Sequence, residues 1–387
     1  MYNFVTLLYE RASLSDLTLI LLAAGSSSRF AQDVKKQWLR IEHQPLWQFV
    51  ADKLNKSNLF SQIIIVGAPH EIDFMQQYAS YEFVAGGDSR QESLKNALTY
   101  VTNSYVLVND IARACISPAL LKRIISKKES ADVVVPYLPV TDTIVYDNKT
   151  IDRDKVKRVQ TPQLSRTTIL KKALNTKELF TDESSAIVAN GGTRTFVLGE
   201  DDAHKITYPE DLNKIPCLKS PSDAILSGNG FDVHAFDDKG VMWLGGVKIE
   251  SDFGFKAHSD GDVAIHALID ALLGAAGMGD IGMLFPDNDD TYKDIDSKEL
   301  LKRVVEKIYN FGFEIINADI TIAVQKPRIG NYKLEMRRVL ADILNIDASR
   351  MNVKATTTEK LGFIGRAEGV GVIANANLKY LNWKMIG

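Results

Sequence analysis

The stretch LTLILLAAGSSSRF, residues 17–30, decides the fold of the first half of the chain. Its first eight residues contain one polar side chain, that of Thr18. The run is far shorter than the ~20 apolar residues that span a bilayer, so we expect a strand buried on both faces. The loop that follows is rich in glycine and serine, and such a loop can bring backbone N–H groups close to phosphate oxygens.

The pattern of an apolar strand followed by a helical stretch repeats as far as about Thr207. Further strands are expected at QIIIVGA, YEFVAGG, YVLVND and ADVVVPYL, which begin at residues 62, 81, 105 and 131. Helical spacing lies between them, at residues 45–55, 88–101 and 116–128. Alternating helices and nearly all-apolar strands predict an α/β fold with a doubly wound, mostly parallel sheet. Ligands of such sheets bind at the carboxyl ends of the strands.

The pattern restarts after a segment that contains prolines and serines. We expect a leader at residues 1–16, a first domain at 17–213, a linker at 214–227 and a compact α+β domain at 228–387. Strands of the second domain are expected around Asp232 and at residues 241–249, 314–325, 350–357 and 369–381, and helices at 262–276, 297–312 and 331–344.

The composition is that of an ordinary globular protein. Of 387 residues, 45% are hydrophobic and 25% charged, and the net charge is -3, which gives no general attraction to nucleic acid or to an anionic membrane. The N-terminal residues lack the basic start and unbroken apolar core of a secretory signal. Cys115 and Cys217 are expected to form no disulfide framework and no zinc site, which is typical of the cytosol. We therefore expect a cytoplasmic protein with no nucleic-acid or membrane partner.

Charged residues gather at the predicted strand ends of the first domain. Arg29 and Lys36 follow the first strand, Arg90 and Ser93 stand at a helix start, and Asp110 ends a buried strand. A helix start attracts anions, and an aspartate at a strand end can hold Mg²⁺ against a triphosphate. Each feature alone is also typical of a plain turn or a helix cap. Their combination indicates a phosphate site.

Six motifs in this region resemble those of 2-C-methyl-D-erythritol 4-phosphate cytidylyltransferases. They are LAAGSSSRF, KKQ, GGDSRQES, VNDIAR, TPQ and HKITYPEDL, in the family's order between residues 17 and 212. The resemblance implies a nucleotidyltransferase-like fold and a reaction between CTP and methylerythritol phosphate. It further implies that Arg29 and Lys36 stabilise charge on the α-phosphate of CTP, and that Arg153 and Lys205 position methylerythritol phosphate.

The same resemblance implies magnesium ligands and a substrate pocket. Asp110, with Asp202, would hold Mg²⁺. The other residues implied to bind substrate are Gly25, Arg90, Ser93, Arg113, Thr143 and Thr161. Asn109 and Ile111 depart from the family's usual residues, but neither change removes a charge, so we expect the activity to be kept.

The implied reaction needs few special groups. A phosphate oxygen attacks the α-phosphate, and pyrophosphate leaves in line. Because two anions must approach each other, positioning and charge neutralisation dominate. A phosphate monoester is already ionised near neutral pH, so no general base is required.

The second half contains a metal-ligand pattern. Asp232 and His234 stand two residues apart on a predicted strand, so their side chains point the same way, and His266 lies on a predicted helix. One carboxylate with two histidines is a zinc set that leaves a fourth position open for a substrate. Asp262 and Asp270 each lie four residues from His266, and Asp270 is a candidate to orient a metal-bound histidine.

Hydroxyl and cationic side chains gather in KATTTEKLGFIGR, residues 354–366. Such a loop suits the oxygens of a diphosphate, and Glu359 is a candidate ligand for a second ion such as Mg²⁺. The alternative for this loop is a threonine-rich strand end followed by an exposed charged turn.

The motifs GFDVHAF, AHSDGDVAIHALIDALLGAAGMGDIG, LFPD and VKATTTEKLGFIGR make residues 228–378 similar to 2-C-methyl-D-erythritol 2,4-cyclodiphosphate synthases. The resemblance implies that Asp232, His234 and His266 bind zinc. It also implies that a 2-phosphate attacks a β-phosphate, so that a cyclic diphosphate forms and CMP leaves. The residues implied to stabilise the transition state are His258 and Thr357. Those implied to bind substrate are Asp232, Val233, His234, His258, Ser259, Asp280, Ile281, Gly282, Ala323, Arg328, Thr356, Thr357, Thr358, Glu359, Phe363 and Arg366.

Together the halves predict a bifunctional enzyme of the methylerythritol phosphate route to isoprenoid precursors. The alternatives are another nucleotide-sugar transferase fused to a zinc phosphohydrolase, and a metal-binding scaffold. The synthase family is trimeric and the cytidylyltransferase family forms dimers, so we expect at least a trimer and consider a hexamer. A kinase step separates the two reactions, and an assembly with that kinase is a further hypothesis.

Overall fold

The computed structural model describes residues 16–238, 241–255, 260–286 and 295–386, and these form two compact units. The second unit is Pro221–Leu381, and the first contains the chain up to Ser220 together with the segment that begins at Asn382. The division falls within the linker expected at residues 214–227. The expected leader, apart from Asp16, and the expected site residues His258 and Ser259 lie outside the described residues.

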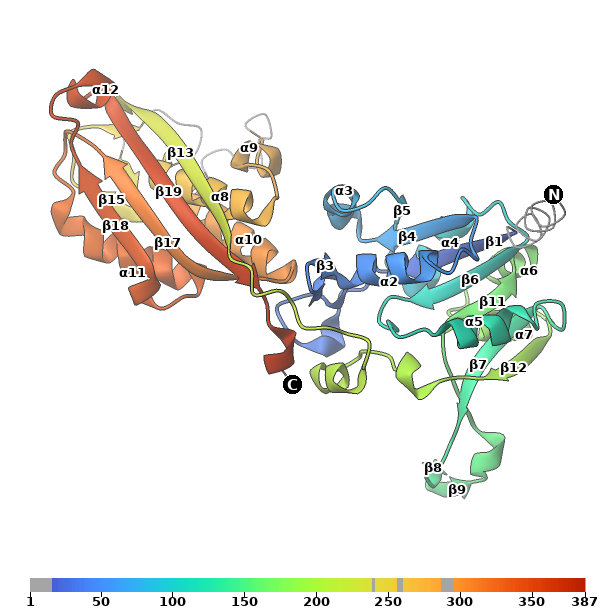
Figure 1. Cartoon of the computed structure of the whole chain (residues 1–387). Coiled ribbons are helices and arrows are strands. Elements are labelled where there is room, and N and C mark those ends of the chain that lie inside the picture. Colours follow the sequence, from blue (N-terminus) through green and yellow to red (C-terminus); the bar gives the residue numbers. More distant parts are fainter. Residues whose placement is uncertain (1–15, 239–240, 256–259, 287–294, 387) are drawn as a thin grey trace, which may run out of the picture. The chain divides into compact units, whose positions relative to one another are not determined.

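An eight-stranded sheet forms the centre of the first unit (Figure 1). Its order is β10-β7-β11-β6-β1-β4-β5, and β12 pairs with β7. The strands are β1 (Leu17–Leu22), β4 (Gln62–Gly67), β5 (Glu82–Ala85), β6 (Tyr105–Asp110), β7 (Val133–Pro139), β10 (Lys157–Val159), β11 (Gln163–Arg166) and β12 (Arg194–Leu198). The pairs β1–β4, β1–β6, β4–β5 and β7–β12 are parallel, whereas β11 runs antiparallel to β6 and β7. The predicted mostly parallel sheet is confirmed.

Helices cover the sheet because its central strands are apolar on both faces. Leu19, Ile20 and Leu21 of β1 are all fully buried. The α-helices are α2 (Leu46–Asn55), α3 (Ile72–Gln76), α4 (Arg90–Leu98), α5 (Pro118–Ile125), α6 (Thr167–Ala173) and α7 (Glu183–Ala189). Ser89 and Ser117 cap α4 and α5 by accepting hydrogen bonds from backbone N–H groups, which explains where these helices begin.

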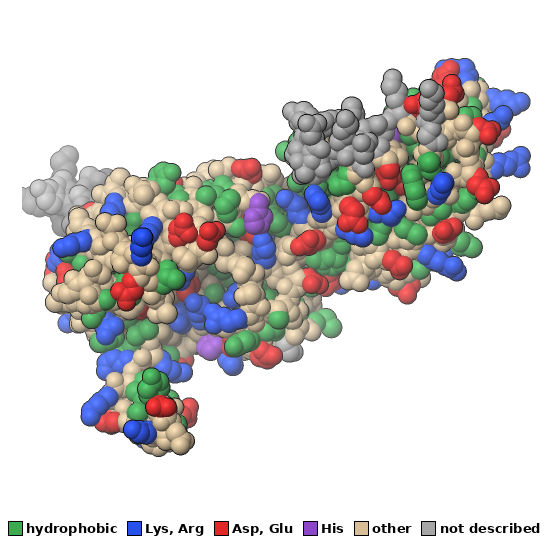
Figure 2. All heavy atoms as spheres, turned by 180° about the vertical axis from the view of Figure 1, so that it is seen from behind, with side chains coloured by type: hydrophobic (Ala, Val, Ile, Leu, Met, Phe, Trp, Pro, Cys, Tyr) green, Lys and Arg blue, Asp and Glu red, His purple; other side chains and the backbone are tan. Residues whose placement is uncertain are grey.

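Two short hairpins of the first unit were not predicted. One pairs β2 (Arg40–Ile41) with β3 (Gln44–Pro45), and the other pairs β8 (Ile144–Tyr146) with β9 (Lys149–Ile151). Asp147 and Asn148 at the second turn have φ angles of 48° and 57°, as a two-residue hairpin requires. In Figures 1 and 2 this β8–β9 arm projects from the first unit and carries hydrophobic side chains.

The second unit packs its helices against one face of a five-stranded sheet of order β16-β13-β19-β17-β18. The strands are β13 (Leu226–Asp237), β16 (Gly254–Phe255), β17 (Phe313–Ala323), β18 (Met351–Thr356) and β19 (Gly369–Tyr380). The helices are α8 (Val263–Ala276), α9 (Ile281–Leu284), α10 (Ser297–Asn310), α11 (Lys333–Leu344) and α12 (Gly362–Gly365). Gly230 lets α8 approach β13, because a Cβ atom there would lie 2.0 Å from the carbonyl oxygen of Ala267. The predicted α+β unit is confirmed.

One predicted strand, at residues 241–249, is instead a hairpin of β14 (Met242–Leu244) and β15 (Val247–Ile249). Gly245 and Gly246 form its turn with φ angles of 61° and 77°, which residues other than glycine rarely adopt. The glycine pair is therefore a turn signal, not an interruption of one strand.

The expectation that the two cysteines form no disulfide is wrong for this structure. Cys115 and Cys217 are joined by a disulfide, although 102 positions separate them in sequence. The loop after β6 and the segment that follows Pro209–Lys214 come together in the first unit. The number of cysteines in a sequence does not show which of them lie close together in the folded chain.

None of the helices within the described residues is long and apolar enough to cross a membrane.

Candidate active sites

A cleft of about 410 Å³ opens at the carboxyl ends of β1 and β6. The expected residues that line it are Gly25, Arg29, Lys36, Arg90, Ser93, Asp110 and Lys205. They come from the glycine- and serine-rich loop, the turn around Lys36, the start of α4, the end of β6 and the loop before Tyr208. The parallel sheet thus brings distant segments to one edge, and cations predominate among the charged side chains.

Lys36 is held against the glycine- and serine-rich loop. Its backbone N–H donates to Ser27 Oγ at 3.0 Å, and its Nζ donates to the carbonyl oxygen of Ile206 at 3.2 Å. Burial and the nearby cations Lys205 and Arg29 lower the pKa of Lys36. A partly buried cation among other cations is a favourable position for binding an anionic phosphate.

A fully buried carboxylate, Glu71, organises the residues on both sides of Lys36. Its Oε1 accepts from Lys35 Nζ at 2.6 Å, and its Oε2 accepts from Gln37 Nε2 at 3.1 Å and from Trp38 Nε1 at 3.0 Å. Sequence reasoning missed Glu71 because it lies outside the recognised motifs. A glutamate in an ordinary helix start carries no local signal of burial.

Asp110 lies between two cations at the base of the cleft. Its carboxylate accepts from Arg90 Nε at 3.1 Å and from Lys205 Nζ at 2.6 Å. Burial alone would raise the pKa of Asp110, but Arg90 and Lys205 hold it at about 2, so the group is ionised at neutral pH. Arg90 also pairs at 2.7 Å with Glu183, which is fully buried and was not anticipated.

Other expected residues of the first unit lie outside the cleft lining. Arg113 donates to the carbonyl oxygen of Ala203 at 2.6 Å, and Asp202 is exposed in a short 3-10 helix. Thr161 is buried beside the strand end, where its Oγ1 lies 3.4 Å from the backbone nitrogen of Asp110. Thr143 and Arg153 flank the β8–β9 arm, and neither lines the cleft of its own chain.

The loop that carries Lys205 is fixed by another buried carboxylate, that of Asp211. It accepts from the backbone N–H groups of Thr207 and Tyr208, both at 2.9 Å, and its Oδ1 lies 2.8 Å from His204 Nε2. Although burial alone would raise the pKa of Asp211, these hydrogen bonds lower it well below the usual range.

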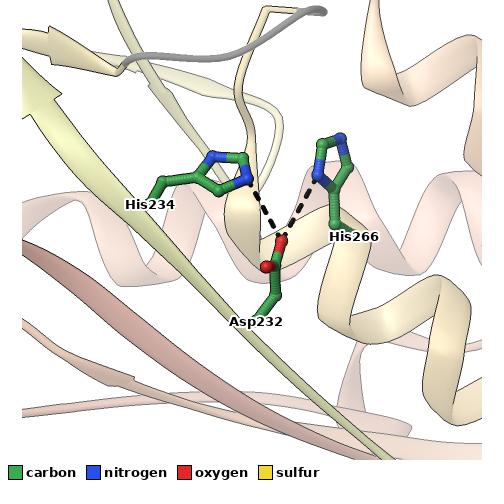
Figure 3. A group of neighbouring side chains, drawn as sticks. All are labelled: Asp232, His234 and His266. Atoms are coloured by element: carbon green, nitrogen blue, oxygen red, sulfur yellow. Dashed lines mark ion pairs between the residues drawn. The ribbon is translucent and has the colours of Figure 1, made fainter. Parts of the chain in front are cut away.

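In the second unit, Asp232, His234 and His266 converge between β13 and α8 (Figure 3). Asp232 Oδ2 lies 3.3 Å from His234 Nε2 and 3.4 Å from His266 Nδ1. A tetrahedral ion with bonds of about 2.0–2.1 Å has ligand–ligand edges of about 3.3–3.4 Å. The spacing therefore fits a shared divalent ion. Among the described residues, no other group of three such side chains meets.

The other ring nitrogens of both histidines are engaged. His234 Nδ1 lies 2.9 Å from the carbonyl oxygen of Gly261, which can only accept, so Nδ1 carries the proton. His266 Nε2 lies 3.1 Å from Ser297 Oγ. Burial alone would lower the pKa of His234, but the hydrogen bond and the negative charge of Asp232 raise it.

The two aspartates expected beside His266 have different partners. Asp262 is the N-cap of α8, and its buried carboxylate also accepts from the backbone N–H groups of Gly245 and Gly246 at 2.8 and 2.6 Å. Asp270 accepts from Ile281 N at 2.8 Å. The ring of His266 contacts Ser297, which carried no sequence signal beyond a helix start, and the orienting role expected for Asp270 stays a prediction.

The remaining expected residues of the second unit lie at loops and strand ends. Asp280 caps α9, where Ile281 and Gly282 begin the helix, and Val233 lies on β13 between the two ligands. Ala323 ends β17, and Arg328 is exposed in the loop after it. The others lie at the end of β18 and around α12, namely Thr356, Thr357, Thr358, Glu359, Phe363 and Arg366. Thr357 Oγ1 donates to Glu359 at 3.0 Å, and Arg366 pairs with Glu368.

Two family models match the chain. That of 2-C-methyl-D-erythritol 4-phosphate cytidylyltransferase matches residues 17–217, and that of the YgbB family matches residues 225–379.

Similar proteins span the whole length. The chain is 67% identical to a bifunctional enzyme IspD/IspF from Sulfurimonas denitrificans, with 100% of both chains covered. It is 51% identical to a bifunctional enzyme IspD/IspF from Aliarcobacter butzleri over 95% of this chain and 99% of the relative. The solved structure of the bifunctional IspDF from Campylobacter jejuni covers 95% of this chain and is itself covered completely, with 47% identity and a TM-score of 0.88.

Proposed function

The chain belongs to the bifunctional IspD/IspF enzymes of isoprenoid precursor synthesis, and from this membership we propose which residues carry out its two reactions. The first activity is that of a cytidylyltransferase, and the second is that of a cyclodiphosphate synthase. We assign cytidylyl transfer to residues 17–213 and cyclisation to residues 228–381, since the segment that begins at Asn382 belongs to the first unit. Neither a phosphohydrolase nor an inactive scaffold accounts for the match over both halves.

In the first site, we assign charge neutralisation to Arg29 and Lys36. The substrates are CTP and methylerythritol phosphate, whose phosphate oxygen attacks the α-phosphate while pyrophosphate leaves. The observation that carries this proposal is the convergence of Arg29, Lys36, Arg90 and Lys205 on one cleft at the strand ends. Fixed cations there stabilise charge that develops on the transferred phosphorus group, without a general base.

Magnesium would bind in this cleft through Asp110. Mg²⁺ usually takes only one or two carboxylates together with substrate phosphates and water, so a site built on the carboxylate of Asp110 fits. We therefore propose that Arg90 and Lys205 hold Asp110 ionised and in place. Asp202, which does not line the cleft, has weaker support as a second ligand.

In the second site, we propose that Asp232, His234 and His266 hold Zn²⁺. When bound, this ion would act as a Lewis acid for the β-phosphate of the cytidylylated substrate. Thr357 and Glu359, with His258, are proposed to bind the diphosphate and a second ion such as Mg²⁺. The 2-phosphate of the substrate is then the nucleophile, and CMP is the leaving group.

We propose that the enzyme is a homo-oligomer, at least trimeric. The face of the second sheet opposite α8 carries Phe231, Val233 and Ile373, which are 65%, 43% and 50% exposed. A contiguous apolar face is typical of a subunit contact. On the β8–β9 arm, Tyr146 is 74% exposed and Arg153 lies outside its own cleft, which supports a second contact through the first domain. Trimers joined through the arms would form a hexamer.

The oligomer proposal is tested by sedimentation of the variants Phe231→Glu and Tyr146→Glu. The first should break the trimer, and the second should break contacts between trimers. Wild-type protein that sediments as a monomer would contradict both proposals.

We also propose a cytoplasmic location and a loose association with the kinase that acts between the two steps. Cell fractionation tests the first. Gel filtration of a mixture with the kinase tests the second, and separate elution at micromolar concentrations would count against it.

The central experiment follows both reactions with the purified protein. With CTP, methylerythritol phosphate and Mg²⁺ we expect pyrophosphate release, and with the cytidylylated 2-phosphate we expect CMP and a cyclic diphosphate in phosphorus NMR. Lys36→Met should abolish only the first reaction, and Asp232→Asn only the second. Linear phosphates as the second product would overturn the cyclisation.

A further inference from the structure

A hydrogen-bonded chain of Asp260, Ser297 and His266 stands behind the candidate metal centre. Ser297 is the first residue of α10 and is fully buried. Its Oγ lies 2.5 Å from Asp260 Oδ1 and 3.1 Å from His266 Nε2. The opposite ring nitrogen of His266, Nδ1, faces Asp232 Oδ2 at 3.4 Å.

The direction of each hydrogen bond follows from the donors available. Both oxygens of Asp260 act as acceptors, since Oδ1 also receives Asp262 N and Oδ2 receives Ser297 N, each at 3.2 Å. A serine hydroxyl has a single proton, and a contact of this length to a carboxylate uses it. Ser297 Oγ can then only accept from His266, so Nε2 of the histidine carries the ring proton.

This assignment has a chemical consequence for the metal site. A neutral histidine with its proton on Nε2 presents an unprotonated Nδ1, which is the form that binds a metal. The ring of His234 is oriented through the carbonyl oxygen of Gly261, which no side-chain substitution removes. For His266 the same role falls to a side chain, and it can therefore be tested.

We propose that Ser297, held by Asp260, is a positioning residue that fixes the tautomer and ring orientation of His266 for metal binding. The proposal rests on the proposed metal site and names the residues that prepare it. The turn at residues 260–262 serves both histidines, because Gly261 bonds His234 and Asp260 bonds Ser297. Neither Ser297 nor Asp260 touches the ion.

The test is the zinc affinity of the full-length Ser297→Ala protein, measured by competition with a chromophoric chelator. Loss of an outer hydrogen bond to a metal-bound histidine typically weakens binding about 10- to 100-fold, and we expect a loss of that size. The substitution removes no charge, so the loss of zinc affinity cannot come from weaker electrostatic attraction of the ion. Cyclisation at saturating zinc should recover most of its rate, which separates this role from contact with substrate.

Two further variants complete the design. Ser349→Ala is the control, because Ser349 is exposed and lies in the first turn of a short helix that an aspartate caps. The zinc affinity of this variant should equal that of the wild type. Ser297→Thr keeps the hydroxyl and should restore much of the affinity. If Ser297→Ala does not fold, Asp260→Ala replaces it. Without the carboxylate the serine hydroxyl loses its fixed acceptor and is free to donate to Nε2 of His266, so zinc affinity should again fall.

The outcomes are distinguishable. A folded Ser297→Ala protein that binds zinc as tightly as the wild type overturns the proposal, as does equal weakening in Ser349→Ala. Wild-type protein that binds no zinc overturns the proposed metal site itself.

Discussion

Glu71 binds the side chains on both sides of Lys36, and this arrangement explains how a flexible lysine can be fixed in an open cleft. Lys35 and Gln37 both donate to this buried carboxylate, and Gln37 Nε2 also lies 3.3 Å from the carbonyl oxygen of Gly25. The turn around Lys36 is thereby joined to the phosphate-binding loop. Rigid placement of charge before the reaction is what electrostatic catalysis requires.

The variant Glu71→Gln should therefore slow cytidylyl transfer, although residue 71 is not expected to contact either substrate. An amide cannot accept from all three donors, and one unsatisfied buried group costs about 1–3 kcal/mol. Because the lost hydrogen bond loosens the turn that positions Lys36, kcat should drop about ten- to a hundredfold with little change in KM for CTP. Steady-state kinetics at a temperature where the protein stays folded measures it, with the exposed Glu82→Gln as control. A change in KM alone would contradict the assignment.

Asp211 predicts a pH-dependent stability for the first unit. Its pKa in the folded protein lies below the value of about 3.9 for an unfolded aspartate, so its stabilising effect is complete above that pH. The effect is lost as the pH falls through the folded-state pKa. Asp211→Asn should cost about 1–3 kcal/mol at pH 7, and the difference from the wild type should shrink below pH ~4. Urea unfolding at several pH values checks this, and a constant difference would contradict it.

Site residues at the ends of sheet strands could be predicted from the sequence. Residues that act through tertiary contacts with other side chains were missed. Arg29 and Lys36 follow a recognisable strand and Asp110 ends another, so their meeting could be foreseen. Glu71 and Ser297 act through contacts with distant side chains. A buried carboxylate or a helix-start serine looks the same in sequence whether or not it holds a functional neighbour.

At the scale of elements, the start of α8 determines where His266 lies. Asp262 accepts from four backbone N–H groups, two in α8 and two in the turn between β14 and β15. The hairpin and the helix are thus tied through one side chain. Periodicity predicted α8 itself, but not that a glycine pair would turn the preceding strand back toward its cap.

Asp262→Ala should destabilise the second unit by about 3 kcal/mol or more, because two helix-start and two turn N–H groups lose their acceptor. Thermal unfolding of the second unit, monitored through zinc release, measures the loss. Asp296→Ala at α10 removes a cap that bonds one backbone N–H group and should cost about 1 kcal/mol. Equal losses in the two variants would show that the contacts with Gly245 and Gly246 add nothing.

At the scale of the whole molecule, the chain leaves the first unit after Ser220 and re-enters it at Asn382. Trp383 is 3% exposed, and its Nε1 donates to the carbonyl oxygen of Arg40 at 2.6 Å. Neither this return nor the disulfide between Cys115 and Cys217 could be predicted. Both depend on contacts between segments far apart in sequence, and no local pattern records them.

Trp383→Ala should destabilise the first unit although the residue follows the synthase domain. Removal of a buried tryptophan side chain costs about 3–5 kcal/mol. Calorimetry should show a lower transition for the cytidylyltransferase unit, while zinc affinity stays unchanged. Met385→Ala, at a side chain that is 83% exposed, should leave both transitions in place. A loss confined to the synthase transition would contradict the assignment of Trp383 to the first unit.

The return of Trp383 also sets an order of events during synthesis. The ribosome makes the strands of the cytidylyltransferase unit first, but must add residues 221–381 before Trp383 exists. At about 5–20 residues per second, those residues take roughly 10–30 s. During that interval the nascent first unit lacks one of its buried side chains, so the part of its surface that Trp383 covers stays exposed to solvent. The domain that starts first is therefore completed last.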